Sequence, residues 1–238
     1  MNPSKTQCIF FGSRQNIARI PKDLVIKFNG TEIKPSTQVK NLGIYMDNYL
    51  TFEKHIDETY KKTIGTLMYF NRIKDKMPLD TRKMIIQSLA LSFRNYCSTI
   101  WGNTSKSQIL RVQKLKNFAA KVAIGSGRKY DRATPYIDSL KWLKMENKLL
   151  FDACAFVYKA INNYIPNWIL KLYNVSDTIP IITRQSNNLA VPRTRTKAGE
   201  RNMNVRAAVL WNTLPVVVKN SGSLVAFKRK LKEFYLSH

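Results

Sequence analysis

Cysteine, histidine and acidic residues are scarce in this chain of 238 residues. Its three cysteines, Cys8, Cys97 and Cys154, are widely spaced and odd in number, which is typical of buried thiols in a reducing compartment rather than of a disulfide framework. The two histidines, His55 and His238, are far apart, so four clustered ligands for a zinc ion are not expected. These shortages argue against a disulfide-stabilised secreted domain and against a zinc module.

The motifs of several enzyme classes are also missing. The chain has no G-x-x-x-x-G-K phosphate-binding loop, no G-x-S-x-G serine-hydrolase elbow and no pair of adjacent aspartates for a two-metal site. His55 near Asp57 could suggest acid–base chemistry, but a solvated histidine on the polar face of a helix is the favoured interpretation. We therefore predict no cofactor and no metal-binding residue in this chain.

Long hydrophobic runs are absent as well. No apolar run approaches the roughly 18–20 residues that a membrane-spanning helix needs. Residues 1–7 are polar, and the apolar run at 8–11 is too short for the core of a signal peptide. We therefore expect a soluble intracellular protein, in the nucleus or the cytoplasm, that has no membrane partner.

Positive charge is what the chain has in excess. Forty Lys and Arg residues stand against fifteen Asp and Glu, which gives a formal net charge of +25 and a pI near 10.1. Such an excess repels itself in the folded state unless a polyanion neutralises it. Nucleic acid is the first candidate and an anionic membrane surface the second. The apolar stripes are typical of a bundle core rather than of a lone membrane-bound helix, so the membrane ranks last.

The first fifty residues favour β-structure. An apolar run at 7–11 reads as a short strand that ends at Gly12-Ser13, and Asn29-Gly30 between two β-rich runs is a strong hairpin signal, because both residues tolerate positive φ. Residues 39–46 form a further strand candidate, with Gly43 inside it. The sequence therefore predicts a small antiparallel β region over residues 1–50.

From residue 52 onward the pattern becomes helical. Apolar residues recur at spacings of three and four along residues 56–68, and Thr51 is a candidate cap for this helix. Three further helices are bounded by proline or glycine signals: one after Pro78, one over 107–124 that stops at Gly125, and one over 144–161. The pattern predicts a helical bundle over residues 51–172.

The last third of the chain has a different character. Residues 173–204 are polar and carry no clean period, which predicts a basic aperiodic arm, with residues 189–191 as a strand candidate. Two short helices are predicted in residues 205–238, a C-terminal helical tail. The predicted fold class is therefore mainly α, with a small antiparallel β region at the N-terminus, a helical bundle, a basic arm and C-terminal helices.

Short motifs occur in a fixed order along almost the whole chain. They are Asn2-Pro3-Ser4-Lys5-Thr6 with Ile9-Phe10-Phe11-Gly12-Ser13; Asn41-Leu42-Gly43-Ile44 with Asp47, Leu50-Thr51-Phe52 and His55-Ile56; Tyr96 with Trp101-Gly102; the helix at 112–120; Val191-Pro192-Arg193-Thr194-Arg195; and Leu210-Trp211-Asn212-Thr213-Leu214-Pro215 before Phe227-Lys228-Arg229-Lys230-Leu231-Lys232. In this order they resemble the C-terminal part of the reverse transcriptases of non-LTR (LINE-type, jockey-like) retrotransposons. The last pair of motifs is the most specific.

This resemblance implies the end of a polymerase palm at 1–50, a helical thumb at 51–172 and a post-thumb extension beyond. It further implies a truncated RNA-directed DNA polymerase, whose fingers, remaining palm and Mg²⁺-binding carboxylates would precede residue 1. Lys5 matches, by resemblance only, a lysine near the incoming triphosphate, although an exposed lysine near a terminus is the favoured interpretation. The implied partners are RNA and DNA, as an RNA–DNA hybrid or a duplex held by its backbone.

Two sets of candidate nucleic-acid-binding residues lie in the first half of the chain. Phe11, Gly12 and Ser13 match the family's hairpin that holds the primer end, and a strand ending in a turn is an equally weighted alternative. On the predicted third helix, one basic face adjoins an apolar stripe, so the helix could dock on the bundle and contact phosphates. That face consists of Arg111, Lys114 and Lys121.

A third set lies in and just after the aperiodic arm, where Glu200 is the only opposing charge. Its members are Arg193, Arg195, Lys197, Arg201 and Arg206. A flexible segment of this charge can follow a phosphate backbone and become ordered on binding. For this set, as for the helix face, the alternative is a plain solvated basic surface.

Two functions remain open on the sequence. The first is backbone binding by a fragment of such a polymerase, and the alternative is a cellular protein-interaction module derived from such a fragment. Added salt separates them, because phosphate binding weakens by about 0.9 in log K per neutralised phosphate for each unit of log salt on B-DNA. A complex with a protein partner is expected to be insensitive to salt.

We expect this chain alone to have no polymerase activity, because its sequence lacks the carboxylate pair that would hold two metal ions. A primer-extension assay on an RNA template with Mg²⁺ tests this expectation. Magnesium-dependent synthesis by the purified chain would contradict it.

Overall fold

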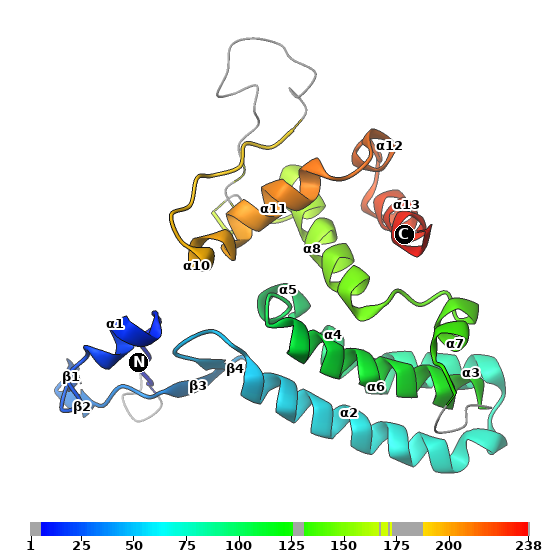
Figure 1. The fold of residues 1–238 in the computed structure, drawn as a ribbon, viewed down its shortest axis with the longest axis horizontal. Coiled ribbons are helices and arrows are strands. Elements are labelled where there is room, and N and C mark those ends of the chain that lie inside the picture. The colour runs from blue at the N-terminus through cyan, green and yellow to red at the C-terminus, as the bar shows by residue number, and fades with distance from the viewer. Residues whose placement is uncertain (1–5, 126–130, 167, 171, 173–187, 238) are drawn as a thin grey trace, which may run out of the picture. The chain divides into compact units, whose positions relative to one another are not determined.

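The computed structural model describes residues 6–125, 131–166, 168–170, 172 and 188–237 (Figure 1). The described residues are mainly α-helical, with a small antiparallel β region near the N-terminus, which confirms the predicted fold class. The chain divides into two compact units, residues 1–133 and residues 134–238. The boundary between them falls within residues 51–172, the segment that the sequence predicts to be one bundle.

The predicted hairpin around Asn29-Gly30 is confirmed. Strand β1 (Ile26–Phe28) pairs antiparallel with β2 (Thr31–Ile33), and Ile26 lies opposite Ile33. The two turn residues have φ angles of 47° and 75°, the left-handed values that a two-residue hairpin turn requires.

Residues 38–47 form a second hairpin, so the prediction of one strand over 39–46 is wrong. Strand β3 (Gln38–Asn41) pairs antiparallel with β4 (Ile44–Asp47) across Leu42-Gly43, whose φ angles are 45° and 84°. Positive φ is unfavourable for leucine. The Tyr96 hydroxyl donates a hydrogen bond of 2.7 Å to the Leu42 carbonyl, a contact from far along the chain that holds this turn.

Residues 7–11 do not form the predicted strand, because their backbone groups bond to a loop and a side chain instead of a ladder. The Ser36 amide donates to the Cys8 carbonyl at 2.8 Å, and the Asn48 side-chain amide donates to the Phe10 carbonyl at 2.8 Å. The short helix α1 (Arg14–Ala18) follows, and the Ser13 hydroxyl caps it by accepting from the Asn16 amide at 3.2 Å.

The helices of the first unit pack around two long ones, α2 and α6, which run side by side (Figure 1). Their bounds are α2 (Glu53–Ile73), α3 (Leu79–Ile85), α4 (Leu91–Asn95), α5 (Ser98–Trp101) and α6 (Lys106–Ile124), with a 3₁₀ turn at Lys74–Lys76 and a π-helical turn at Ile86–Ala90. The predicted apolar stripe of α6 is buried, as are the residues of α2 that face it: Val112, Leu115, Ala119 and Val122 on α6, and Ile56, Thr63 and Leu67 on α2.

Helix α6 stops at Gly125, as the sequence predicts. Gly125 has a φ of 84°, and an added Cβ would lie 2.2 Å from the Arg82 guanidinium. That guanidinium donates to the carbonyls of Ile124 at 3.1 Å and Lys74 at 3.2 Å, so it satisfies the ends of two elements at once. Arg82 therefore serves the fold rather than an external anion.

Asp47, at the end of β4, organises the connection into α2. Its carboxylate accepts hydrogen bonds from the amides of Tyr49 (3.0 Å), Thr51 (3.0 Å) and Phe52 (2.9 Å) and from the Thr51 hydroxyl (2.9 Å). The residue that precedes α2 is Phe52, with a φ of 58°, so the prediction of Thr51 as its cap is off by one residue. Although burial raises the pKa of Asp47, these hydrogen bonds outweigh it and hold the pKa below its ordinary value.

Every regular element described in the second unit is a helix. Its helices are α7 (Thr134–Ser139), α8 (Met145–Ile161), α10 (Lys197–Glu200), α11 (Met203–Asn212), α12 (Val216–Lys219) and α13 (Leu224–Ser237). Helices α8, α11 and α13 pack together around Phe227, which is fully buried. Its ring stacks on Tyr158 at 4.3 Å and on Trp211 at 6.0 Å between centroids.

The Leu210–Pro215 motif has a structural explanation within this unit. Asn212 accepts from the Leu189 amide at 2.8 Å and donates to the Leu189 carbonyl at 2.9 Å, which ties this residue of the arm to α11. Leu189 is buried in the same core as Trp211 and Leu214. The motif therefore builds the fold of the second unit.

Among the three cysteines, burial is complete only for Cys154. Burial raises the pKa of its thiol to about 11, which makes it an unreactive core group. Cys8 and Cys97 are half-buried. In the parts of the chain that the structure describes, no helix combines the length and the apolar character needed to cross a bilayer.

We expect Asp47→Asn to lower the free energy of unfolding by about 1–3 kcal/mol at neutral pH, because an amide cannot accept all of these hydrogen bonds. A carboxylate whose pKa is lower in the folded than in the unfolded protein stabilises the folded state at pH values above its unfolded-state pKa. This contribution is lost as the pH falls through its folded-state pKa. The difference from the wild type should therefore shrink below about pH 4. Chemical denaturation across pH measures it, with Asp23→Asn, an exposed aspartate, as the control. An unchanged difference down to pH 2 would contradict this account.

Candidate nucleic-acid interface

The first predicted set, Phe11, Gly12 and Ser13, lies together beside the β3–β4 hairpin. Phe11 is 49% exposed, whereas the Gly12 amide already donates to the Asn48 carbonyl at 3.0 Å. A Cβ on Gly12 would meet nothing closer than 3.5 Å, so no close approach within the chain itself requires glycine. Of this set, Phe11 is the side chain most available to a ligand. Lys5 lies outside the described residues.

The second predicted set, Arg111, Lys114 and Lys121 on α6, differs from residue to residue in how available the side chain is to a ligand. The Arg111 guanidinium pairs with the Asp57 carboxylate and lies over the Tyr60 ring at 5.0 Å from its centroid. Arg111 therefore joins α6 to α2, and a phosphate would have to compete with these contacts. Lys114 is exposed and Lys121 is half-buried, so the helix face presents Lys114 most openly.

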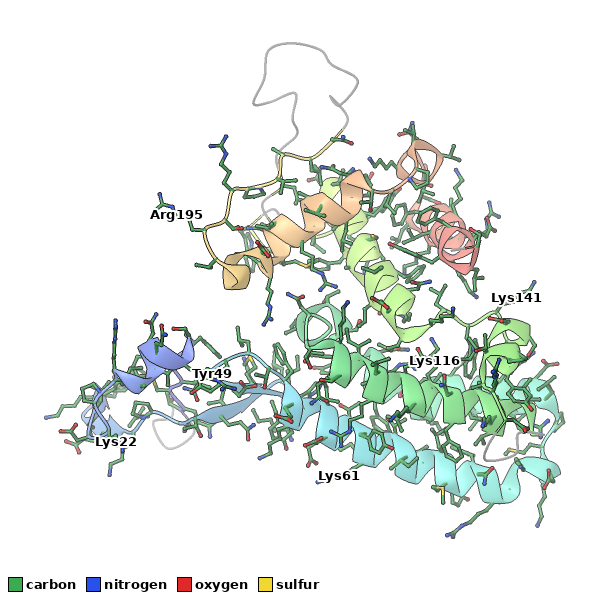
Figure 2. The ribbon with its side chains drawn as sticks, viewed as in Figure 1. Lys22, Tyr49, Lys61, Lys116, Lys141 and Arg195 are labelled. Atoms are coloured by element: carbon green, nitrogen blue, oxygen red, sulfur yellow. The ribbon has the colours of Figure 1, made fainter. Side chains whose placement is uncertain are left out.

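The third set is also split. Arg193 and Arg195 are exposed in the irregular segment before α10, and Figure 2 shows Arg195 projecting away from the ribbon. Arg201 is exposed just before α11, whereas Arg206 is half-buried on α11, where burial lowers its pKa and the nearby Cys154 opposes that shift. The side chain of Lys197 lies outside the description.

Sequence reasoning did not single out a basic face on α13. Lys228, Arg229 and Lys232 are exposed and recur at helical spacings, while Phe227 and Leu231 on the other face are buried. Between Lys228 and Lys232 the helix rises about 6 Å, or one turn. The same 3.6-residue period that predicted this helix could have found the face. We call Lys228, Arg229 and Lys232 the α13 basic stripe.

A cleft of about 260 Å³ lies between the β3–β4 turn, α2 and α4. Its walls combine aromatic and ionisable side chains, among them Tyr45, Phe93, Tyr96, His55, Glu58 and Lys62. The ammonium groups of Lys40 and Lys54 lie over the Tyr45 ring, at 5.1 Å and 5.2 Å from its centroid. We call this feature the hairpin cleft.

His55 is buried, so the prediction of a solvated histidine is wrong. It is 5% exposed, and its ring centroid lies 6.2 Å from that of Trp101 on α5. Burial, together with the positive charge of Lys62, lowers the pKa of His55. The imidazole is therefore neutral at neutral pH. Its Nε2 atom is buried and has no hydrogen-bond partner among the described residues.

Neither a metal cluster nor a relative defines the function of these surfaces. Within residues 6–125, 131–166, 168–170, 172 and 188–237, no three His, Cys, Asp or Glu side chains are grouped so that they could hold a metal ion. Comparisons with protein-family models, curated proteins and solved structures gave no significant match. The proposed function therefore depends on the chain's own side chains.

We expect the pKa of His55, followed by NMR of the imidazole protons, to lie below the ordinary value of about 6.5. Lys62→Gln should raise it, because a nearby positive charge is removed. Lys54→Gln, on the same helix but with its ammonium over Tyr45, is the matched control and should leave it unchanged. A wild-type value at or above 6.5 would show that His55 is not buried in this way.

Proposed function

We propose that this chain binds nucleic acid through its backbone phosphates, by contacts that do not read the base sequence. We further propose that it corresponds to the end of the palm, the thumb and the post-thumb part of a non-LTR reverse transcriptase. The net charge of +25 supports the first proposal, because fifteen carboxylates cannot neutralise forty cations. The order of the sequence motifs supports the second.

The α13 basic stripe is the structural feature that most directly supports binding to backbone phosphates. Its three cations share one helix face, and Glu233 is the only acidic residue of α13. The buried face of the same helix anchors it on the core through Phe227 and Leu231. A rigid helix that presents cations one turn apart can contact successive phosphates with little loss of side-chain entropy.

Exposed arginines and lysines elsewhere support the same function. Arg193 and Arg195 are exposed on the arm of the second unit, and Lys114 is exposed on α6 of the first unit. Contacts of this kind fix a protein on the backbone and carry no sequence information. They suit a protein that must grip any RNA–DNA hybrid or duplex.

A second candidate function, protein binding by a module derived from such a fragment, is favoured by three exposed valines. Val216, Val217 and Val225 are 62%, 70% and 80% exposed on α12 and α13, which pack against each other. Single exposed apolar residues are ordinary, but three on neighbouring helices favour a protein contact. Such a contact would persist as salt rises.

We expect the triple change Lys228→Gln, Arg229→Gln and Lys232→Gln to weaken binding to a DNA duplex and to an RNA–DNA hybrid alike. The slope of log K against log salt should become shallower by about 0.9 for each phosphate that the variant no longer neutralises. Fluorescence anisotropy at several salt concentrations measures both the affinity and the slope.

The matched control is Lys22→Gln, Lys27→Gln and Lys34→Gln, which removes the same charge from exposed lysines around the first hairpin. An equal loss of affinity in both variants would show that net charge alone, rather than the α13 basic stripe, drives binding. Val216→Ser with Val217→Ser should leave nucleic-acid binding unchanged. If it alone abolishes a salt-insensitive complex with a protein, the second candidate is favoured.

A further inference from the structure

The hairpin cleft has the make-up of a site for a flat, polar ring. Tyr45, Phe93 and Tyr96 supply aromatic surface, and Phe93 and Tyr96 are 42% and 49% exposed. The hydrogen bond from the Tyr96 hydroxyl to the Leu42 carbonyl fixes the hairpin tip against the end of α4. The cleft is therefore held by a specific contact between two elements.

The polar groups of the cleft are placed to read the edge of such a ring. His55 is neutral and has a buried Nε2 without a partner among the described residues, and the Glu58 and Lys62 side chains stand beside it on α2. His55 Nε2 is closed to solvent, so the edge of a ligand in the cleft meets the Glu58 carboxylate and the Lys62 ammonium. The carboxylate accepts hydrogen bonds and the ammonium donates them.

We propose that the hairpin cleft receives one unstacked nucleobase, which carries an exocyclic amino group that donates to Glu58. This inference rests on the proposed function, because the same nucleic acid must be held by its phosphates. Lys40 and Lys54, whose ammonium groups lie 5.1 Å and 5.2 Å from the Tyr45 ring centroid, are placed to hold phosphates next to the inserted base. A base that is paired and stacked in a duplex cannot enter, so the site favours single-stranded segments.

An apolar side chain of a protein partner fits the cleft less well. It would cover the aromatic walls but would offer no hydrogen bond to the Lys62 ammonium or to the Glu58 carboxylate, which pairs with the Lys61 ammonium at 3.3 Å, and it would cost both groups part of their hydration. A nucleobase satisfies both requirements, since it has a face that stacks and an edge that donates and accepts.

The test compares single-stranded oligonucleotides of equal length that carry cytosine, thymine or no base, so that the number of phosphates is constant. We expect the wild type to bind the cytosine oligomer most tightly and the abasic one least, with a difference of roughly five-fold or more from stacking of one base. On the wild type, the His55 imidazole signals should shift with the cytosine oligomer and stay unchanged with the abasic one.

Two variants separate stacking from edge recognition. Phe93→Ala should remove most of the preference for base-bearing over abasic oligomers, and Glu58→Gln should remove the preference for cytosine over thymine. Tyr69→Ala is the matched control, since Tyr69 is an aromatic residue of α2 that is 61% exposed and does not line the cleft. It should keep both preferences.

The outcomes distinguish this inference from the proposed function. If all three oligomers bind equally and weaken together with salt, the cleft takes no base while phosphate binding stands. If none binds at low salt, the proposed function fails and the cleft assignment fails with it. Equal losses in Phe93→Ala and Tyr69→Ala, or no shift of the His55 signals with cytosine, would also overturn the assignment.

Discussion

Repulsion between like charges is the constraint on which the rest of this structure depends. A net charge of +25 on 238 residues opposes compact folding through self-repulsion, yet the chain forms two compact units. Some cations make contacts within the fold itself. The Arg82 guanidinium donates to the carbonyls of Lys74 and Ile124, and the Arg111 guanidinium pairs with Asp57 and lies over the Tyr60 ring. Others, such as those of the α13 basic stripe, are presented to solvent on one face of an anchored helix. The exposed group is what makes a polyanionic partner the simplest explanation of the composition.

The sequence predicts the helices well wherever a period and a stop signal coincide. The pattern predicts a helix over 107–124, and α6 spans Lys106–Ile124, because its apolar stripe packs on α2 and Gly125 supplies the positive φ that ends it. The pattern does not reveal the β3–β4 hairpin, because its turn begins with Leu42, which does not favour positive φ. The hydrogen bond that holds that turn comes from Tyr96, and no local pattern reveals a partner at such a separation.

The candidate site residues show the same limit: a local sequence pattern does not reveal contacts between distant parts of the chain. Helical spacing places Arg111 correctly beside the apolar stripe, but it cannot show that Asp57, 54 residues earlier, already holds the guanidinium. The sequence around His55 favours a solvated side chain, yet Trp101 on α5 buries it. In contrast, the α13 basic stripe is visible in the sequence once the buried positions of that helix are known. Local periodicity therefore predicts which residues share a face, whereas tertiary contacts decide which of them remain available to a ligand.

The most direct test of the central claim is the thermal unfolding midpoint of the intact chain, measured with and without a DNA duplex at low and at raised salt. If the surplus of cations repels itself and is relieved by phosphates, the duplex raises the midpoint at low salt, and this gain shrinks as salt displaces the duplex. Salt alone should also raise the midpoint of the free protein by screening the repulsion. A midpoint that responds neither to the duplex nor to salt would contradict the account.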